Sequence, residues 1–397
     1  MKFGINFFPS FRPEDSTTAD YFAQCLRLAV RADELGYNSV KTVEHSFYDY
    51  GGHSTNPCIF LSAVAALTKR IRMMTGAVIP AFHHPAHLAG DLSMLDNMSR
   101  GRLDAGMGRA FLPKEFEVYG VPLHESRPRF EEAIGAIKRL WTEDSVTHKG
   151  QYWQFDEVHL MPRPVQQPHP PVWIPGGGSV ETWQWCAEMD YVYAYLSYYG
   201  YKDGKATMDG FWREMGRLGK DRNPNRAAFL QFVGVAETRE KALELYREPA
   251  EYFYGRCLHV DPAWASPPGY MTEGTMRAGM TSQVGRAAAN SARSKMRATE
   301  MKDIVDLGYV IIGSPDEVVE QLTEVATELN VAHLMLLLQY GNMGKELAKY
   351  NTKLFAEKVM PRLQPLFAEW EDRWWPQPME PAQRAEIPAF KPGLAAE

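Results

Sequence analysis

The sequence predicts an α/β protein folded as a (β/α)8 TIM barrel with insertions. Eight short apolar runs recur along the 397 residues, and a stretch with the spacing of an amphipathic helix follows each run. Such alternation indicates a parallel sheet covered by helices. No glycine-rich dinucleotide fingerprint follows the first run, which disfavours an open doubly wound sheet. A barrel forms its active site at the carboxyl ends of its strands.

The predicted strands are residues 3–8, 39–43, 71–79, 102–107, 171–174, 191–196, 229–235 and 333–338. Between the first two, apolar residues at helical spacing predict a helix that stops at Gly36, and these residues are Phe22, Cys25, Leu26, Ala29, Ala32 and Leu35. The same pattern predicts further helices over residues 57–68, 85–98, 130–142, 180–187, 202–219, 239–254, 315–329 and 345–359.

Composition favours a small-molecule partner. The formal net charge of -6 and the pI near 6.0 give no general attraction to nucleic acid or to an anionic membrane. Four widely separated cysteines without C-x-x-C spacing predict unpaired buried thiols and no structural zinc. The apolar start is too short for a signal peptide, and no stretch approaches the ~18 uninterrupted apolar residues of a membrane span. We therefore expect a cytoplasmic protein.

One elaborated domain over residues 1–365 accounts for most of the chain, which exceeds the ~250 residues of a plain barrel. Residues 262–301 are rich in Pro, Gly, Met, Ser and Arg and predict an insertion, either a mobile lid or a structural excursion on the side of the barrel. Residues 366–397 form a C-terminal extension. Its three tryptophans predict docking against protein, with a homodimer partner as one option.

Polar or glycine-rich segments follow four of the predicted strands. Glu44 and His45 follow the second, residues 80–85 the third, residues 106–111 the fourth and residues 175–179 the fifth. Each polar group left unpaired in a packed core costs roughly 1 to 3 kcal/mol, so an acid and an imidazole emerging together indicate a site. His45 is a candidate general acid or base, with a structural histidine as the alternative.

The turn Gly176-Gly177-Gly178-Ser179 opens a predicted helix, so its N–H groups and the positive end of the helix could hold a phosphate. The alternative is a turn that only links strand to helix. Arg109 could add a bidentate positive charge for the same anion, or could form an ion pair with Glu115 or Glu117. His83 and His84 do not predict a metal site, because adjacent residues of an extended segment point apart.

The chain resembles the bacterial luciferase-like flavin monooxygenases over about residues 1–365. The specific pieces are the Glu44-His45 strand end and the segment Asp96-Asn97-Met98-Ser99-Arg100-Gly101-Arg102. Supporting pieces are Met1-Lys2-Phe3-Gly4, Ile79-Pro80, His84-Pro85, Gly108-Arg109, Phe116, Tyr119-Gly120, Ile312-Gly313-Ser314-Pro315 and Val359-Met360-Pro361. Members of that family share the (β/α)8 barrel and bind FMN, usually reduced by a separate flavin reductase, or the deazaflavin F420.

The resemblance implies positions for the cofactor. Arg109 and the turn from Gly176 to Ser179 would take the flavin phosphate, while Thr75, Gly76 and Ala77 would lie beside the isoalloxazine ring, where relatives often carry a non-prolyl cis peptide. His45 matches a histidine implicated as a catalytic base. The chain departs from luciferase at several positions, with Ser46 in place of a second histidine, Gly108 in place of a reactive cysteine, and Gly176 and Gly177 in place of an acidic residue and a serine.

The function implied is an oxidoreductase, an FMN-dependent monooxygenase that uses reduced FMN and O2 to oxygenate a small organic substrate through a flavin C4a-(hydro)peroxide. His45 would exchange a proton, and Glu44 would position His45 or contact the ring edge. An apolar substrate wall is expected from Phe8, Phe47, Phe111 and Tyr195. The alternatives are an F420-dependent dehydrogenase or reductase, disfavoured because Glu115 and Glu117 stand near Arg109, and a non-catalytic flavin-binding barrel.

Overall fold

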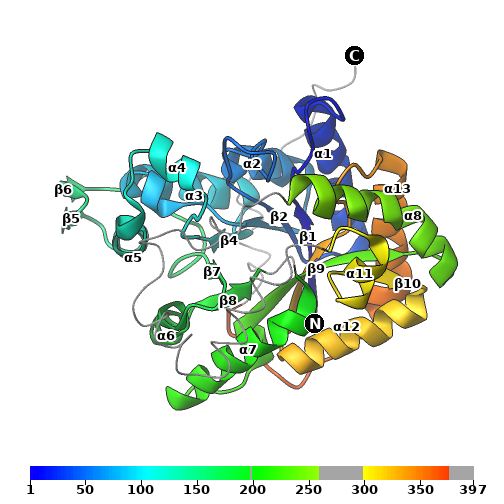
Figure 1. The fold of residues 1–397 in the computed structure, drawn as a ribbon. Helices are drawn as coiled ribbons and strands as arrows, with labels where there is room; N and C mark the ends of the chain where they lie inside the picture. Colours follow the sequence, from blue (N-terminus) through cyan, green and yellow to red (C-terminus); the bar gives the residue numbers. More distant parts are fainter. Residues whose placement is uncertain (197–198, 259–297, 375–397) are drawn as a thin grey trace.

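The computed structural model describes residues 1–196, 199–258 and 298–374 (Figure 1). Eight parallel strands form a closed barrel, as predicted, because β8 pairs with β9 and completes the ring. The strands are β1 (Lys2–Phe7), β2 (Ser39–Thr42), β3 (Arg72–Thr75), β4 (Leu103–Gly106), β7 (Val172–Gly176), β8 (Val192–Tyr195), β9 (Ala227–Val235) and β11 (His333–Leu337).

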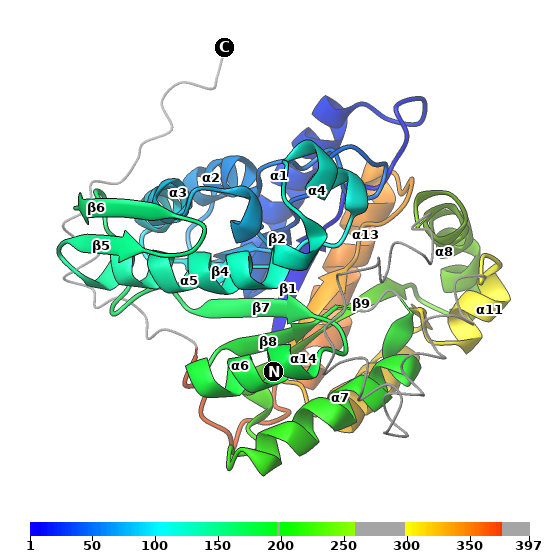
Figure 2. The same ribbon diagram turned by 60° about the vertical axis from the view of Figure 1, so that its left-hand side comes forward.

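Helices surround the barrel in both ribbon views (Figures 1 and 2). The long ones are α1 (Thr18–Leu35), α2 (Pro57–Leu67), α3 (Pro85–Ser99), α5 (Ser126–Thr142), α6 (Val180–Met189), α7 (Gly200–Arg217), α8 (Arg239–Tyr252), α12 (Pro315–Leu329) and α13 (Lys345–Leu354). Short helices are α4 (Pro113–Val118), α11 (Met301–Asp306) and α14 (Met360–Leu363). The first helix follows its local signals, since the Thr17 side chain caps it and Gly36, at φ 88°, ends it.

Three features differ from the sequence prediction. The third strand ends at Thr75 and not at Ile79, because the chain leaves the ladder at Gly76. An extra strand, β10 (Val310–Gly313), pairs with the last four residues of β9, and its apolar run was not assigned to a strand from the sequence. A two-stranded antiparallel hairpin, β5 (Val146–Lys149) and β6 (Gln154–Val158), lies at the periphery (Figures 1 and 2). Its mostly polar residues gave no apolar signal.

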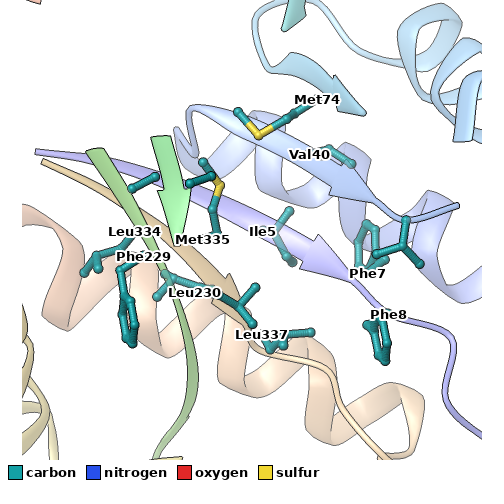
Figure 3. Close-up of a cluster of buried hydrophobic side chains, with 14 of the residues drawn as sticks. Ile5, Phe7, Phe8, Val40, Met74, Phe229, Leu230, Leu334, Met335 and Leu337 are labelled. Atoms are coloured by element: carbon teal, nitrogen blue, oxygen red, sulfur yellow. The ribbon is translucent and has the colours of Figure 1, made fainter. Parts of the chain in front are cut away.

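The strands divide their side chains between two faces. Phe3 packs against Phe355 beyond α13, and Phe7 packs against Phe60 of α2, each at a ring distance of 5.8 Å. Since side chains alternate along a strand, Asn6 points into the barrel. The apolar residues of β1, β2, β9 and β11 form one continuous buried cluster (Figure 3).

The segment after α14 covers the amino ends of the strands. Asp372 forms an ion pair with Lys2 at the start of β1, and its Oδ2 lies 3.4 Å from Nε2 of His333 at the start of β11. Trp374 donates its ring N–H to the carbonyl of Asp190 at 2.9 Å and lies under the guanidinium of Arg226. The expected docking of a C-terminal tryptophan is therefore made, for Trp374, to its own chain.

Some of the sequence predictions concern residues that lie partly outside the described ranges. Residues 262–297 of the predicted insertion and Trp375 of the extension lie outside the described residues, and the predicted homodimer remains a prediction. All four cysteines are buried and unpaired, as expected. Among the described residues, none of the helices combines the length and the apolar composition that a membrane span requires.

Asp372 gives a test of the closure at the amino end. Burial by itself raises the pKa of Asp372, but the hydrogen bonds and charges of His333 and Lys2 outweigh burial and hold that pKa well below its usual value. An ionised, paired carboxylate stabilises the fold above the pKa of the unfolded chain, and this contribution is lost as pH falls below about 4. We expect Asp372→Asn to lower the free energy of unfolding by about 2–3 kcal/mol at pH 7, measured by urea denaturation.

The difference between Asp372→Asn and the parent should shrink between pH 4 and pH 2, because the parent carboxylate then protonates on unfolding. Asp144→Asn is the matched control, since Asp144 pairs with Arg163 but its side chain is 99% exposed, and this change should leave stability nearly unaltered. Equal stability of the Asp372→Asn variant and the parent at pH 7 would contradict the closure.

Candidate functional site

The carboxyl ends of neighbouring strands converge, as the sequence analysis expected. Gly76 and Ala77 follow β3, Gly108 follows β4, and Pro175 lies near the end of β7. A Cβ atom built on Gly108 would lie 3.0 Å from the Cβ of Ala77 and 3.4 Å from the Cγ of Pro175. The three strand ends therefore pack directly on one another. The Gly76–Ala77 peptide is cis, which confirms the geometry implied for these residues.

His45 is held by a carboxylate from a distant segment. Its Nδ1 lies 3.2 Å from Oε1 of Glu115, which belongs to α4, and its backbone N–H donates to the carbonyl of Ser54 at 2.9 Å. The same Oε1 accepts the backbone N–H of Ser46 at 2.8 Å, and the Glu115 side chain is 2% exposed. Because a carboxylate only accepts, the ring is assigned Nδ1–H, which leaves Nε2 able to accept a proton.

Glu44 has a different role from the one expected. Its Oε1 lies 2.7 Å from Nε2 of His83, and its Oε2 accepts the backbone N–H of Ile79 at 2.9 Å. Glu44 therefore does not hold His45, because both of its oxygens bind the segment after β3, and its expected contact with the ring edge stays a prediction. Burial lowers the pKa of His83, but the hydrogen bond and charge of Glu44 outweigh it and raise that pKa above its usual value.

From the sequence, Glu115 was expected to pair with Arg109 or to disfavour an acidic cofactor tail, and its contact with His45 was not predicted. The available signal was Pro113, which starts a helix and places Glu115 in its first turn. That signal fixes the helix but not its contact with His45. Spatial proximity across the barrel mouth decides which of the two carboxylates reaches the imidazole.

The glycine-rich turn meets an arginine that the sequence analysis missed. Arg127 of α5 donates from Nη2 to the hydroxyl of Ser179 at 2.8 Å and to that of Thr182 at 3.2 Å. Its Nη1 pairs with Glu131 at 3.2 Å, but its buried Nε has no acceptor among the described residues. Ser179 is the N-cap residue of α6, but its hydroxyl donates to Glu181 at 3.1 Å and does not cap the helix. Open space surrounds the positions where Gly177 and Gly178 would carry side chains.

This arrangement can bind an anion, because a guanidinium and the N–H groups at the start of a helix converge on one turn. Arg109 lies half-buried just after β4. The signal for Arg127 was its place near the start of an amphipathic helix, which does not by itself indicate which turn the side chain reaches.

The four aromatic residues expected in a substrate wall occupy different places. Phe8 and Phe111 lie at ring distances of 6.3 and 5.9 Å from His45, and Tyr50, which the sequence analysis missed, lies at 5.3 Å. Phe47 is 52% exposed and packs on Tyr119. Tyr195 is buried against Phe229 at 5.7 Å.

Lys41 of β2 is a further buried polar residue, and its stem covers Gly76. It is 3% exposed, and burial lowers its pKa to about 7. A Cβ atom built on Gly76 would lie 2.0 Å from the Cε of Lys41. Within the part of the chain that the structure describes, no cluster of three or more His, Cys, Asp or Glu residues could hold a metal ion.

The contact between Lys41 and Gly76 predicts energetic coupling. We expect Gly76→Ala to lower the free energy of unfolding by roughly 1–3 kcal/mol, because the new methyl group overlaps the lysine stem. Adding Lys41→Ala should recover most of that loss, and a double-mutant cycle followed by urea denaturation measures the coupling. Gly177→Ala, into open space, is the control. Additive effects of the two changes would contradict the contact.

The family model described as Luciferase-like monooxygenase matches residues 1–333. The oxygenase component of the flavin-dependent trigonelline monooxygenase of Acinetobacter baylyi is 36% identical over 163 residues, which are 41% of this chain and 45% of that protein. The alkanal monooxygenase alpha chain of Photorhabdus luminescens is 28% identical over 188 residues, 47% of this chain and 51% of that protein. The chain thus spans about half the length of these curated relatives.

Among solved structures, monooxygenase RslO1 from Streptomyces bottropensis matches with a TM-score of 0.72 and 32% identity, over 91% of this chain and 99% of that one. The oxygenating constituent of 3,6-diketocamphane monooxygenase of Pseudomonas putida, solved with FMN, matches with a TM-score of 0.73 and 19% identity, over 91% and 98% of the two chains. An F420-dependent secondary alcohol dehydrogenase matches with a TM-score of 0.63 and 19% identity, over 91% and 98%. The last two likenesses show the fold alone.

Proposed function

The chain belongs to the luciferase-like monooxygenase family, and we propose that it is the oxygenase component of a two-component flavin system. In this proposal it uses reduced FMN, supplied by a separate reductase, and O2 to oxygenate a small organic substrate. The relative with 36% identity is named a flavin-dependent monooxygenase oxygenase component, which supports this choice. F420-dependent proteins share the fold at 19% identity or less, which gives no argument for that cofactor.

The single observation that carries the proposal is the His45–Glu115 pair beside the cis peptide, at the end of the barrel where the anion-binding turn also lies. Arg127 and the turn fit a phosphate, because the buried Nε of Arg127 has no acceptor among the described residues and no side chain caps the start of α6. In the proposal, Arg127, Ser179 and the N–H groups of Gly177 and Gly178 hold the FMN phosphate. Arg109 and Gly176 remain proposed contributors, and Thr75, Gly76 and Ala77 are proposed to lie beside the ring.

Reduced FMN, when bound, supplies the two electrons with which one oxygen atom of O2 enters the substrate and the other leaves as water. The protein orients the reactants, excludes water and moves a proton. His45 accepts and returns that proton at Nε2, while Glu115 fixes its tautomer and orientation. Glu44 is proposed to act as a positioning residue that holds the segment after β3. Phe8, Phe111 and Tyr50 keep water from the imidazole.

The test is to titrate the protein with reduced FMN without oxygen, to admit oxygen, and to follow the transient absorbance and the incorporation of oxygen-18 into candidate substrates. Trigonelline, the compound in the name of the 36% identical relative, is the first substrate to try. We expect stoichiometric binding of reduced FMN and a transient that decays faster in the presence of a substrate. Neither binding nor a transient would overturn the proposal.

His45→Ala should lower the yield of oxygen-18 product by roughly 10- to 100-fold, because a positioned proton donor and acceptor is lost. Reduced FMN affinity should change by no more than about twofold, and added imidazole should restore part of the yield. Glu115→Gln should show a smaller loss, since the ring stays but its orientation relaxes. His87→Ala, whose exposed ring lies on α3, is the control. An unchanged yield in His45→Ala would remove His45 from the mechanism.

Arg127→Leu should weaken FMN binding by about tenfold or more, because a charged hydrogen-bond donor to the phosphate is lost. Riboflavin, which lacks the phosphate, should bind the variant and the parent equally. Arg129→Leu, two residues further along α5 and paired with Glu125, should alter neither affinity. Equal losses for FMN and riboflavin would mean that Arg127 supports the fold of the turn and does not bind the phosphate.

A further inference from the structure

Two polar side chains stand next to each other inside the barrel below the cis peptide. Asn6 of β1 and Lys41 of β2 are register partners, and Met74 of β3 continues the same row. Partners in a parallel ladder project to the same side of the sheet, and Asn6 faces the barrel interior because Phe7 faces the helices. Asn6 is 1% exposed and Lys41 is 3% exposed. The pair is therefore part of the barrel interior.

Neither polar group is satisfied by the protein as described. The Oδ1 of Asn6 is buried and has no donor among residues 1–196, 199–258 and 298–374. Lys41 forms no ion pair with a carboxylate of the described residues, and burial lowers its pKa to about 7. Such groups weaken a fold, since a buried amide or ammonium without a partner costs several kcal/mol. An apolar residue at position 41 would give a more stable fold than the buried lysine does.

The stem of Lys41 leads to the proposed cofactor site. The stem packs so closely on Gly76 that a Cβ atom at this position would lie 2.0 Å from the Cε of Lys41. Gly76 is the first residue of the cis peptide. The lysine thus forms the floor of the site beside the residues proposed to lie along the isoalloxazine ring. The deepest part of a ligand that enters from the carboxyl ends of the strands would therefore contact Lys41.

The two side chains offer complementary chemistry on strands that lie about 4.8 Å apart. Lys41 donates to a carbonyl oxygen, and Asn6 accepts from an N–H group through Oδ1. A ring edge that carries a carbonyl next to an N–H matches both at once, and the pyrimidine part of isoalloxazine has such an edge. Reduced flavin also carries negative charge over this edge when it loses a proton, which an ammonium group favours.

We propose that Asn6 and Lys41 together bind the carbonyl and N–H edge of the flavin pyrimidine ring, and that Lys41 favours the reduced anionic flavin over the oxidised form. The inference rests on the proposed function and extends it to cofactor selection. Lys41 contacts the cofactor directly and tunes its electron affinity. A carboxylate on the substrate is the competing occupant for Lys41, and the test separates the two.

The experiment measures dissociation constants for oxidised FMN in air and for reduced FMN without oxygen, together with the midpoint potential of the bound flavin. Lys41→Met should weaken the binding of reduced FMN by about tenfold or more and that of oxidised FMN by about twofold or less. The midpoint potential of the bound flavin should fall accordingly. Asn6→Leu should weaken both forms by similar factors, because a neutral hydrogen bond is lost from each.

Met74→Leu, in the same row of the barrel, is the control and should change neither affinity nor potential. Lys41→Met should melt at or above the temperature of the parent, and Lys41→Gln provides a second variant if it does not. An unchanged ratio of the two affinities in a folded Lys41 variant overturns the inference. Loss confined to a carboxylate-bearing substrate such as trigonelline also overturns it and assigns Lys41 to that substrate. Failure of the parent to bind reduced FMN would instead refute the proposed function.

Discussion

The rest of the structure depends on the closure of eight parallel strands into one ring. Pairing of β8 with β9, and of β11 with β1, leaves no free edge among these strands and points every carboxyl end the same way. Segments that are far apart in the sequence must then meet at one mouth. His45 and Glu115, 70 positions apart, and Arg127 and Ser179, 52 positions apart, are brought together in this way.

Closure also gives the sheet two buried faces, one toward the helices and one toward the barrel interior. The helix-facing residues of the strands are apolar and make the continuous core, as Phe3 and Phe7 illustrate. The barrel interior tolerates polar groups when they are paired, as in the buried ion pair of Arg72 and Asp104 at 2.8 Å. Asp372 pairs in the same manner at the amino ends of the strands. Against this background, Lys41 has no carboxylate partner among the described residues, and its buried amine is a cost to stability that the proposed role in ligand binding would explain.

The site shows how adjacent residues can take separate tasks. Glu44 and His45 follow one strand, yet their side chains bind different segments, since Glu44 binds His83 while Glu115 binds His45. The pairing gives each imidazole its own carboxylate. One pair stabilises the irregular backbone after β3, and the other leaves a ring nitrogen available at the barrel mouth. The proposed oxygenase requires a histidine that exchanges a proton and a turn that binds a phosphate, both at the carboxyl ends of the strands.

The sequence by itself determined the barrel, the identity of its eight strands, the family and the strand ends that carry the site. These follow from patterns with periods of 2 and 3.6 residues and from short motifs, all of which lie within neighbouring positions of the chain. It did not reveal the polar hairpin, which lacks an apolar pattern, and the short apolar run of β10 was not assigned to a strand. Only the tertiary structure decided that Glu115 and not Glu44 holds His45, that Arg127 reaches the glycine turn, and that Lys41 and Asn6 stand unpaired together. Such contacts depend on ring closure and strand register, which bring residues from distant parts of the chain together. No pattern among neighbouring residues predicts them.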